Sequence, residues 1–132
     1  KITYKISNPK RGDVIVFAAP PDKQEDFIKR IIGLPGETIS LDNGKVVVNG
    51  RVLEESYLSQ TIQTLPGTAL GDEKSLTLGQ DQFFVLGDNR LHSSDSRSWG
   101  FVGKDSIVGR AWIIYWPPPE IKIIPQYSFA GF

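Results

Sequence analysis

The chain has 132 residues, 39% of them hydrophobic, and its 15 basic residues balance 15 acidic ones. This length suits one domain, and the balanced charge excludes an overall field that would draw the chain to nucleic acid, so we expect no nucleic-acid partner. The chain has no cysteine, which excludes disulfides and a thiol nucleophile. It has one histidine, His92, so a metal site would need mostly carboxylates. We expect no metal and no other cofactor.

Short β-branched and aromatic runs, separated by turn residues, predict a mostly β fold. The predicted strands span residues 13–17, 27–32, 45–48, 82–86 and 107–116. Asn-Gly pairs at 43–44 and 49–50 have the spacing of type I′ hairpin turns and predict a three-stranded meander over residues 38–53. The polar stretch 60–74 predicts a flexible excursion from the sheets.

The first candidate motif is the tripeptide Arg11-Gly12-Asp13, which precedes an apolar strand. Its letters match an adhesion signal, but short motifs match by chance. A turn that feeds the strand explains it better, because Gly12 supplies backbone freedom and the apolar run forms the strand.

The second motif places two cations, Lys29 and Arg30, inside a predicted strand. Alternation puts Lys29 on the face of Phe27 and Ile31, so a cation is expected among apolar side chains. Burial lowers a lysine pKa from about 10.4 and prepares it to act as a general base, which an arginine cannot do. The alternative is a lysine on an edge strand, where it blocks edge-to-edge pairing.

The third motif lies in residues 83–102, where a strand ends in Gly-Asp-Asn and a serine-rich loop follows. Loops held by a rigid sheet commonly carry functional sites. The alternative is a solvated loop in which Asp95 and Arg97 form a weak surface pair. His92 is interpreted as a surface or hydrogen-bonded histidine, without a catalytic role.

In this order and spacing, the three motifs resemble the type I signal peptidases, the serine/lysine endopeptidases that remove signal peptides from exported proteins. Residues 11–17 resemble the family's RGD strand, residues 29–37 its Lys-Arg-x-x-Gly-Leu-Pro-Gly-Asp/Glu segment, and residues 87–97 its Gly-Asp-Asn-Arg-x-x-Ser-x-Asp-Ser-Arg segment. Residues 99–102 and 108–111 also fit. The resemblance implies a β-barrel or coiled antiparallel sheets with hairpins.

The resemblance also implies roles for individual residues. Lys29 would be the general base and Ser93 the hydroxyl that orients its amine. Residues implied to support them are Arg30, Asp88, Asn89, Asp95 and Arg97. Weaker candidates for a pocket that accepts the small residues of an Ala-x-Ala-like cleavage site are Phe27, Ile31 and Phe84, for which core packing is the alternative.

One departure from the family concerns the nucleophile. The family's serine lies in a Ser-Met-x-Pro-Thr segment before the RGD strand, whereas this chain begins at Lys1 and has no methionine. We therefore expect a single peptidase domain over residues 1–132, truncated at its N-terminus and inactive without the serine and the main parts of the oxyanion hole.

The resemblance implies signal peptides of exported preproteins as partners. It places the protein at a membrane, either a bacterial plasma membrane or a thylakoid, with the catalytic domain on the extracytoplasmic side. Besides the missing anchor, an apolar surface with Trp99, Trp112 and Trp116 would contact lipid, although core packing explains these tryptophans equally well.

Two other functions stay open. A LexA-like self-cleaving protein shares the serine/lysine chemistry, but the chain shows no DNA-binding segment. A non-catalytic peptide-binding β module, descended from a peptidase, would bind signal-peptide-like ligands without cutting them. Such a module has no need for Lys29 and Ser93 together.

Overall fold

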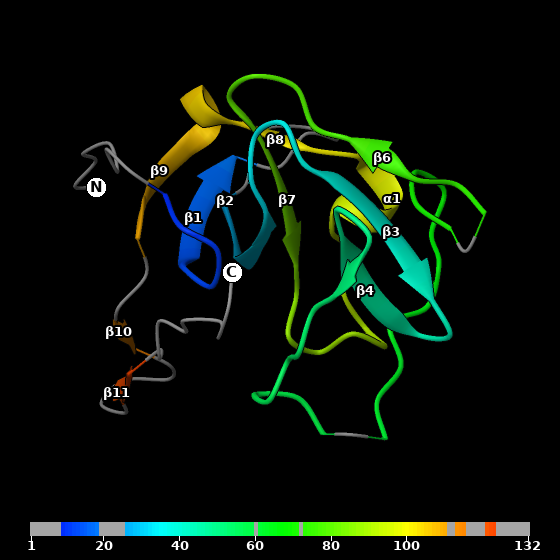
Figure 1. Ribbon diagram of the computed structural model, residues 1–132. Helices are drawn as coiled ribbons and strands as arrows, with labels where there is room; N and C mark the ends of the chain where they lie inside the picture. The colour runs from blue at the N-terminus through cyan, green and yellow to red at the C-terminus, as the bar shows by residue number, and fades with distance from the viewer. Residues whose placement is uncertain are drawn as a thin grey trace.

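The computed structural model describes residues 9–18, 26–59, 61–71, 73–110, 113–115 and 121–123. The described strands are β1 (Val14–Ala18), β2 (Asp26–Gly33), β3 (Thr38–Asp42), β4 (Lys45–Val48), β5 (Arg51–Val52), β6 (Leu76–Thr77), β7 (Gln82–Leu86), β8 (Val102–Gly103), β9 (Ile107–Arg110), β10 (Ile113–Tyr115) and β11 (Ile121–Ile123). The described helices are short, α1 (Ser96–Trp99) and the 3₁₀ turn Lys104–Ser106. The prediction of a mostly β chain is confirmed (Figure 1).

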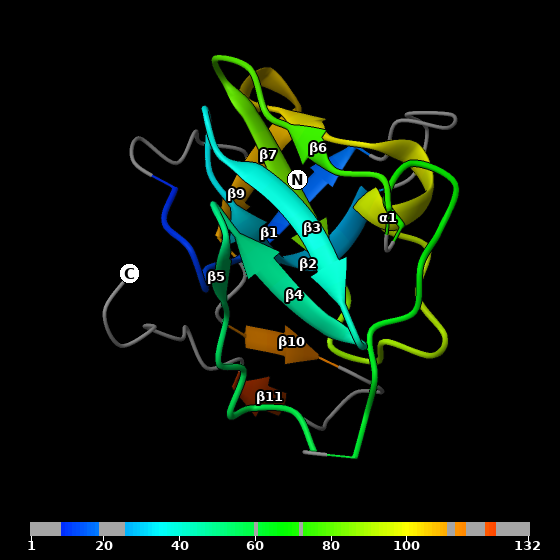
Figure 2. The same ribbon diagram turned by 45° about the vertical axis from the view of Figure 1, so that its right-hand side comes forward.

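The described strands form three sheets with the open orders β8-β7-β2-β1-β9, β5-β4-β3-β6 and β10-β11. All of these strand pairs are antiparallel, as the coiled-sheet prediction requires. Figure 2 shows β3 and β4 lying across the five-stranded sheet. Strand β2 is therefore internal, with β1 on one side and β7 on the other.

Alternation in β2 and β7 divides the core between the two faces of the five-stranded sheet. Ile32 and Leu86 join a buried cluster with side chains of β3 and β4, whereas Ile31 and Val85 join a second cluster with Ile15 and Phe17. Successive side chains of a strand point to opposite faces, so each strand contributes to both clusters. Strand β7 pairs with β2 only from Arg30 to Gly33, so Lys29 lies at the point where the β7 side of β2 becomes open.

The predicted meander is confirmed, with β4 paired to β3 on one side and to β5 on the other. Asn43 and Gly44 have φ angles of 50° and 79°, and Asn49 and Gly50 have 51° and 80°. Type I′ turns require a positive φ at both central residues. The two Asn-Gly pairs therefore form the turns that their spacing predicts.

The polar stretch leaves the sheets as predicted, but residues 61–71 are anchored to the body of the protein. The Thr64 N–H donates to the carbonyl of Gly44 at 2.9 Å, and the Ala69 N–H donates to that of Arg97 at 2.7 Å. Leu70 is fully buried in the core between the sheets. The stretch thus connects the meander to the loop of the third motif.

The end of the chain is described only in part. The strand predicted over 107–116 is observed as β9 and β10, and residues 111, 112 and 116 lie outside the described residues. No helix in the described ranges is long and apolar enough to cross a lipid bilayer.

Candidate active site

The centre of the site is a contact between Lys29 on β2 and Ser93 in the loop after β7. The Lys29 Nζ donates to the Ser93 Oγ at 3.0 Å, although 64 positions separate the two residues. In β2, Lys29 pairs with Ile15 of β1, and the next residue pairs with Leu86 of β7. The amine is therefore held on an internal strand, at the point where β7 ends and its loop begins.

Gly87, the first residue after β7, makes this contact possible. A β-carbon on Gly87 would lie 2.0 Å from the Ser93 Oγ and 3.3 Å from the Lys29 Nζ. The first distance is far inside van der Waals contact, so any larger residue would displace Ser93. The glycine of the Gly-Asp-Asn turn thus supplies the space in which the serine meets the lysine.

The surroundings of Lys29 favour its neutral amine. Burial lowers the pKa of Lys29, the carboxylate of Asp95 opposes this shift, and the guanidinium of Arg97 adds to it. Of these three effects desolvation is the largest, as expected for a partly buried ammonium group. The ring of Phe27, with its centroid 5.7 Å from Nζ, makes a cation–π contact that favours the ammonium form.

Arg30 on β2 forms a bidentate ion pair with Asp88, which belongs to the Gly-Asp-Asn turn after β7. Its Nε and Nη2 donate to the two carboxylate oxygens at 3.0 and 2.8 Å. Its Nη1 donates to the carbonyl of Gly12 at 2.9 Å, which joins the first motif to the other two. The Arg30 side chain is 2% exposed, so its charge depends on these partners.

The loop of the third motif is held by a second bidentate pair, between Asp95 and Arg97. Asp95 is fully buried and Arg97 is nearly so, which excludes the solvated surface pair as an interpretation. The Asp95 carboxylate also accepts the backbone N–H of Gly87 at 3.2 Å and caps helix α1. Asp95 therefore ties both ends of the loop that carries Ser93.

The tripeptide of the first motif is held by contacts within the protein. The guanidinium of Arg11 donates to both carboxylate oxygens of Glu37 at 2.6 and 2.7 Å. Gly12 has a φ angle of 95° and is buried, as is Asp13. A tripeptide engaged in this way is not presented to an adhesion receptor, and the turn interpretation agrees with its geometry.

Two of the pocket candidates are corrected by the structure. Ile31 and Phe84 are both fully buried, in the clusters on opposite faces of the five-stranded sheet. Apolar residues of internal strands pack in the core, so neither side chain is open to a ligand. Phe27 is only partly buried and lies beside Lys29.

Other predicted residues lie at the edge of the site or beyond it. Asn89 and His92 are exposed, and the backbone carbonyl of Asn89 accepts the His92 N–H at 3.1 Å. Trp99 packs its ring against Phe17, with centroids 6.0 Å apart. Trp112 and Trp116 lie outside the described residues.

Sequence reasoning missed a hollow beside the lysine. It has a volume of about 220 Å³ and is lined by Val14, Ile28, Lys29, Arg30 and Asp88. Ile28 is 42% exposed, which is unusual for an isoleucine on an internal strand. Its position next to Lys29 was the available signal, but alternation alone does not say which face stays open.

Comparisons with known proteins agree with this architecture. The family described as "Signal peptidase, peptidase S26" matches residues 1–116. Signal peptidase I of Leptolyngbya laminosa is 46% identical over 124 residues, which cover 89% of this chain and 58% of that protein. A probable signal peptidase I-2 of Synechocystis is 40% identical over 130 residues, covering 94% and 56%.

A crystal structure of a signal peptidase I from Enterococcus faecalis superposes with a TM-score of 0.67 and 35% identity, and the match covers 81% of this chain and 99% of that chain. The chain spans somewhat more than half the length of the relatives from Leptolyngbya laminosa and Synechocystis. With the family pattern present over residues 1–116, the chain belongs to the signal peptidase family, peptidase S26.

Proposed function

We propose that this chain carries the general-base half of a serine endopeptidase that removes N-terminal signal peptides from exported proteins. The observation that carries the proposal is the 3.0 Å contact between the Lys29 amine and the Ser93 hydroxyl. It occurs on an internal strand, where burial lowers the pKa of Lys29. An amine that is neutral near physiological pH is what a serine nucleophile needs as its base.

In the proposed reaction the nucleophile comes from a segment outside these 132 residues. Neutral Lys29 takes the proton of that serine as its oxygen attacks the scissile carbonyl carbon. The resulting ammonium returns the proton to the leaving amine, and the acyl group stays on the serine as an ester. Lys29 then takes a proton from water as the water oxygen attacks the ester carbon, and it returns that proton to the serine oxygen as the ester bond breaks and the acyl product leaves as a carboxylic acid.

The substrate would lie extended along β2. This strand pairs with β7 only from Arg30 onward, so within the described part of the chain no strand pairs with that side of Phe27, Ile28 and Lys29. An added strand finds main-chain donors and acceptors there. The hollow beside Ile28 is small enough to favour the short side chains of an Ala-x-Ala-like site.

The proposed localisation follows from the proposed substrate. Signal peptides are removed as preproteins cross a membrane, so the catalytic domain would lie on the extracytoplasmic face of a bacterial plasma membrane or a thylakoid. Its partners would be preproteins and, through an anchor or an apolar surface, membrane lipid.

The test is cleavage of an Ala-x-Ala signal-peptide substrate, followed by mass spectrometry. Three proteins are compared: this chain, the full-length protein, and the full-length protein with Lys29→Ala. Cleavage by the unaltered full-length protein alone, at the Ala-x-Ala site, is the expected result. Cleavage that survives Lys29→Ala would remove Lys29 from the mechanism.

Failure of all three proteins to cut, with substrate binding intact, would favour a non-catalytic peptide-binding module. Cleavage of the protein's own chain, without cleavage of the added substrate, would favour a self-cleaving protein of the LexA kind. Both results would overturn the proposed reaction on signal peptides.

A further inference from the structure

A second group of polar side chains, centred on Arg90, lies next to the Gly-Asp-Asn turn. None of them has a role in the reaction proposed above. Arg90 follows the Gly-Asp-Asn turn and is fully buried. Its Nη1 donates to the Glu55 carboxylate at 3.0 Å and to the Thr64 hydroxyl at 2.9 Å, and its Nη2 donates to the second Glu55 oxygen. Glu55 and Thr64 belong to the connection between the meander and residues 65–71, far from Arg90 in sequence.

Arg90 is joined directly to the turn that positions Ser93. Its Nε donates to the carbonyl of Gly87 at 2.8 Å. Its own carbonyl accepts from the Nη2 of Arg97 at 2.8 Å. Gly87 in turn lies against both the Ser93 hydroxyl and the Lys29 amine. A displacement of Arg90 would therefore move the backbone on which the Lys29–Ser93 contact rests.

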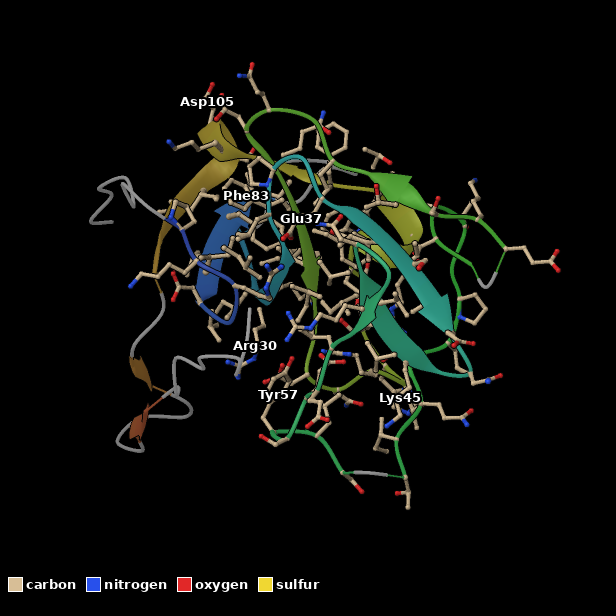
Figure 3. The ribbon with its side chains drawn as sticks, viewed as in Figure 1. Arg30, Glu37, Lys45, Tyr57, Phe83 and Asp105 are labelled. Atoms are coloured by element: carbon tan, nitrogen blue, oxygen red, sulfur yellow. The ribbon has the colours of Figure 1, made fainter. Side chains whose placement is uncertain are left out.

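Tyr57 connects the same segment to the other arginine of the site. Its hydroxyl donates to Glu55, and its ring lies under the Arg30 guanidinium, 4.4 Å from centroid to carbon (Figure 3). Burial, followed by the Glu55 charge, raises the pKa of Tyr57, so the phenol stays protonated and donates. The segment that contains Glu55 and Tyr57 thus touches both Arg30, the chain neighbour of Lys29, and Arg90, which donates to the Gly87 carbonyl.

We propose that Glu55 is a positioning residue for the Lys29–Ser93 pair, acting through Arg90 and the carbonyl of Gly87. This rests on the function proposed above, in which Lys29 is the base. A buried ion pair is seldom retained for net stability, because desolvation offsets the attraction between its charges. Its value here lies in fixing the turn to within the fraction of an ångström that a base and its orienting hydroxyl require.

The test replaces Glu55 by glutamine, which keeps the shape but removes the charge that neutralises Arg90. Glu54→Gln is the matched control, because Glu54 is the exposed neighbour. The first readout is the pKa of Lys29 in this chain, followed by NMR of the carbon next to its amine. The second is kcat and KM of the full-length protein on a signal-peptide substrate.

For Glu55→Gln we expect the turn to loosen and Lys29 to gain solvent, so its pKa rises toward that of a free lysine. We expect kcat to fall between about tenfold and a hundredfold, with KM changed less than about twofold. Glu54→Gln should change neither quantity. A folded Glu55→Gln protein with unchanged Lys29 pKa and unchanged kcat would overturn the proposal.

If the Glu55→Gln protein does not fold, Thr64→Val serves as a second test of the proposal. It removes only the hydroxyl that accepts from Arg90. A smaller rise of the Lys29 pKa in this variant supports the positioning role, and no rise overturns it. Because the NMR readout needs no catalysis, it still tests positioning if the Lys29→Ala protein proves active and the proposed reaction fails.

Discussion

The Ser96 hydroxyl accepts the backbone N–H of Val85 at 2.9 Å, inside the protein. Helix α1 is thereby fastened to β7 near the end of the strand, two residues before Gly87. Because Asp95 caps the same helix and accepts the Gly87 N–H, the loop with Ser93 is closed by side-chain contacts at its base. Ser93 is thus presented by a loop whose two ends cannot move apart freely.

Ser96→Ala should destabilise the protein by about 1–3 kcal/mol, because it leaves the buried Val85 N–H without its acceptor. Urea unfolding followed by circular dichroism measures the change. Ser98→Ala on the same helix is the control, since Ser98 is exposed. Equal stabilities of the two variants would contradict the role assigned to the Ser96 hydroxyl.

Gly87→Ala should separate Ser93 from Lys29, since the new β-carbon would occupy the place of the Ser93 Oγ. We expect the Lys29 pKa to rise and the full-length protein to lose at least about 99% of its activity on a signal-peptide substrate. Gly103→Ala is the control, because a β-carbon there meets nothing within 4 Å. A Gly87→Ala protein with wild-type kcat would show that the contact is dispensable.

Lys29→Met should stabilise the protein at neutral pH, although it removes the base. The pKa of Lys29 is lower in the folded chain than in the unfolded one, so protonated Lys29 costs stability at every pH below its folded pKa. The cost shrinks as the pH rises through the folded pKa and vanishes above the unfolded value of about 10.4.

Thermal unfolding of both proteins at several pH values measures this difference. The advantage of Lys29→Met should narrow in alkaline buffer. Lys45→Met, at an exposed position of β4, is measured beside it as the control for replacing a lysine by methionine. A gap between wild type and Lys29→Met that widens with pH would reverse the direction assigned to the pKa of Lys29.

Asp95→Asn should destabilise the protein by about 3–5 kcal/mol, because it leaves the charge of Arg97 buried without its partner. The free energy of unfolding in urea measures the loss. Asp42→Asn, at an exposed strand end, is the control and should change stability by less than about 0.5 kcal/mol. A similar small change for Asp95→Asn would mean that water reaches the pair.

The turns and strands that the sequence predicted correctly depend on preferences of residues that lie close together in the chain. The two Asn-Gly pairs tolerate a positive φ, so they determine the meander turns without help from the rest of the chain. Alternating apolar residues likewise predicted β2 and β7. The resemblance to signal peptidases singled out Lys29 and Ser93, which the structure brings to 3.0 Å.

Sequence reasoning failed where the answer depends on which sheets pack together. Two neighbouring residues of β2 differ in burial, and the sequence did not predict which one is deeper. Arg30 is more deeply buried than Lys29, because its guanidinium donates hydrogen bonds to Asp88 and to the Gly12 carbonyl. The sequence also did not predict the burial of Asp95 and Arg97, since no local sequence pattern separates a buried ion pair from a solvated one.

The sequence by itself determined the longer strands, the meander turns and the residue types of the site, because these follow from backbone preferences and side-chain alternation over a few residues. It did not predict the short strands β6, β8 and β11. The tertiary structure alone decided that Glu55 neutralises Arg90, 35 positions away, and that the space over Gly87 holds Ser93. Such contacts arise only when the meander and the five-stranded sheet close on one another, because burial and desolvation are properties of the packed chain.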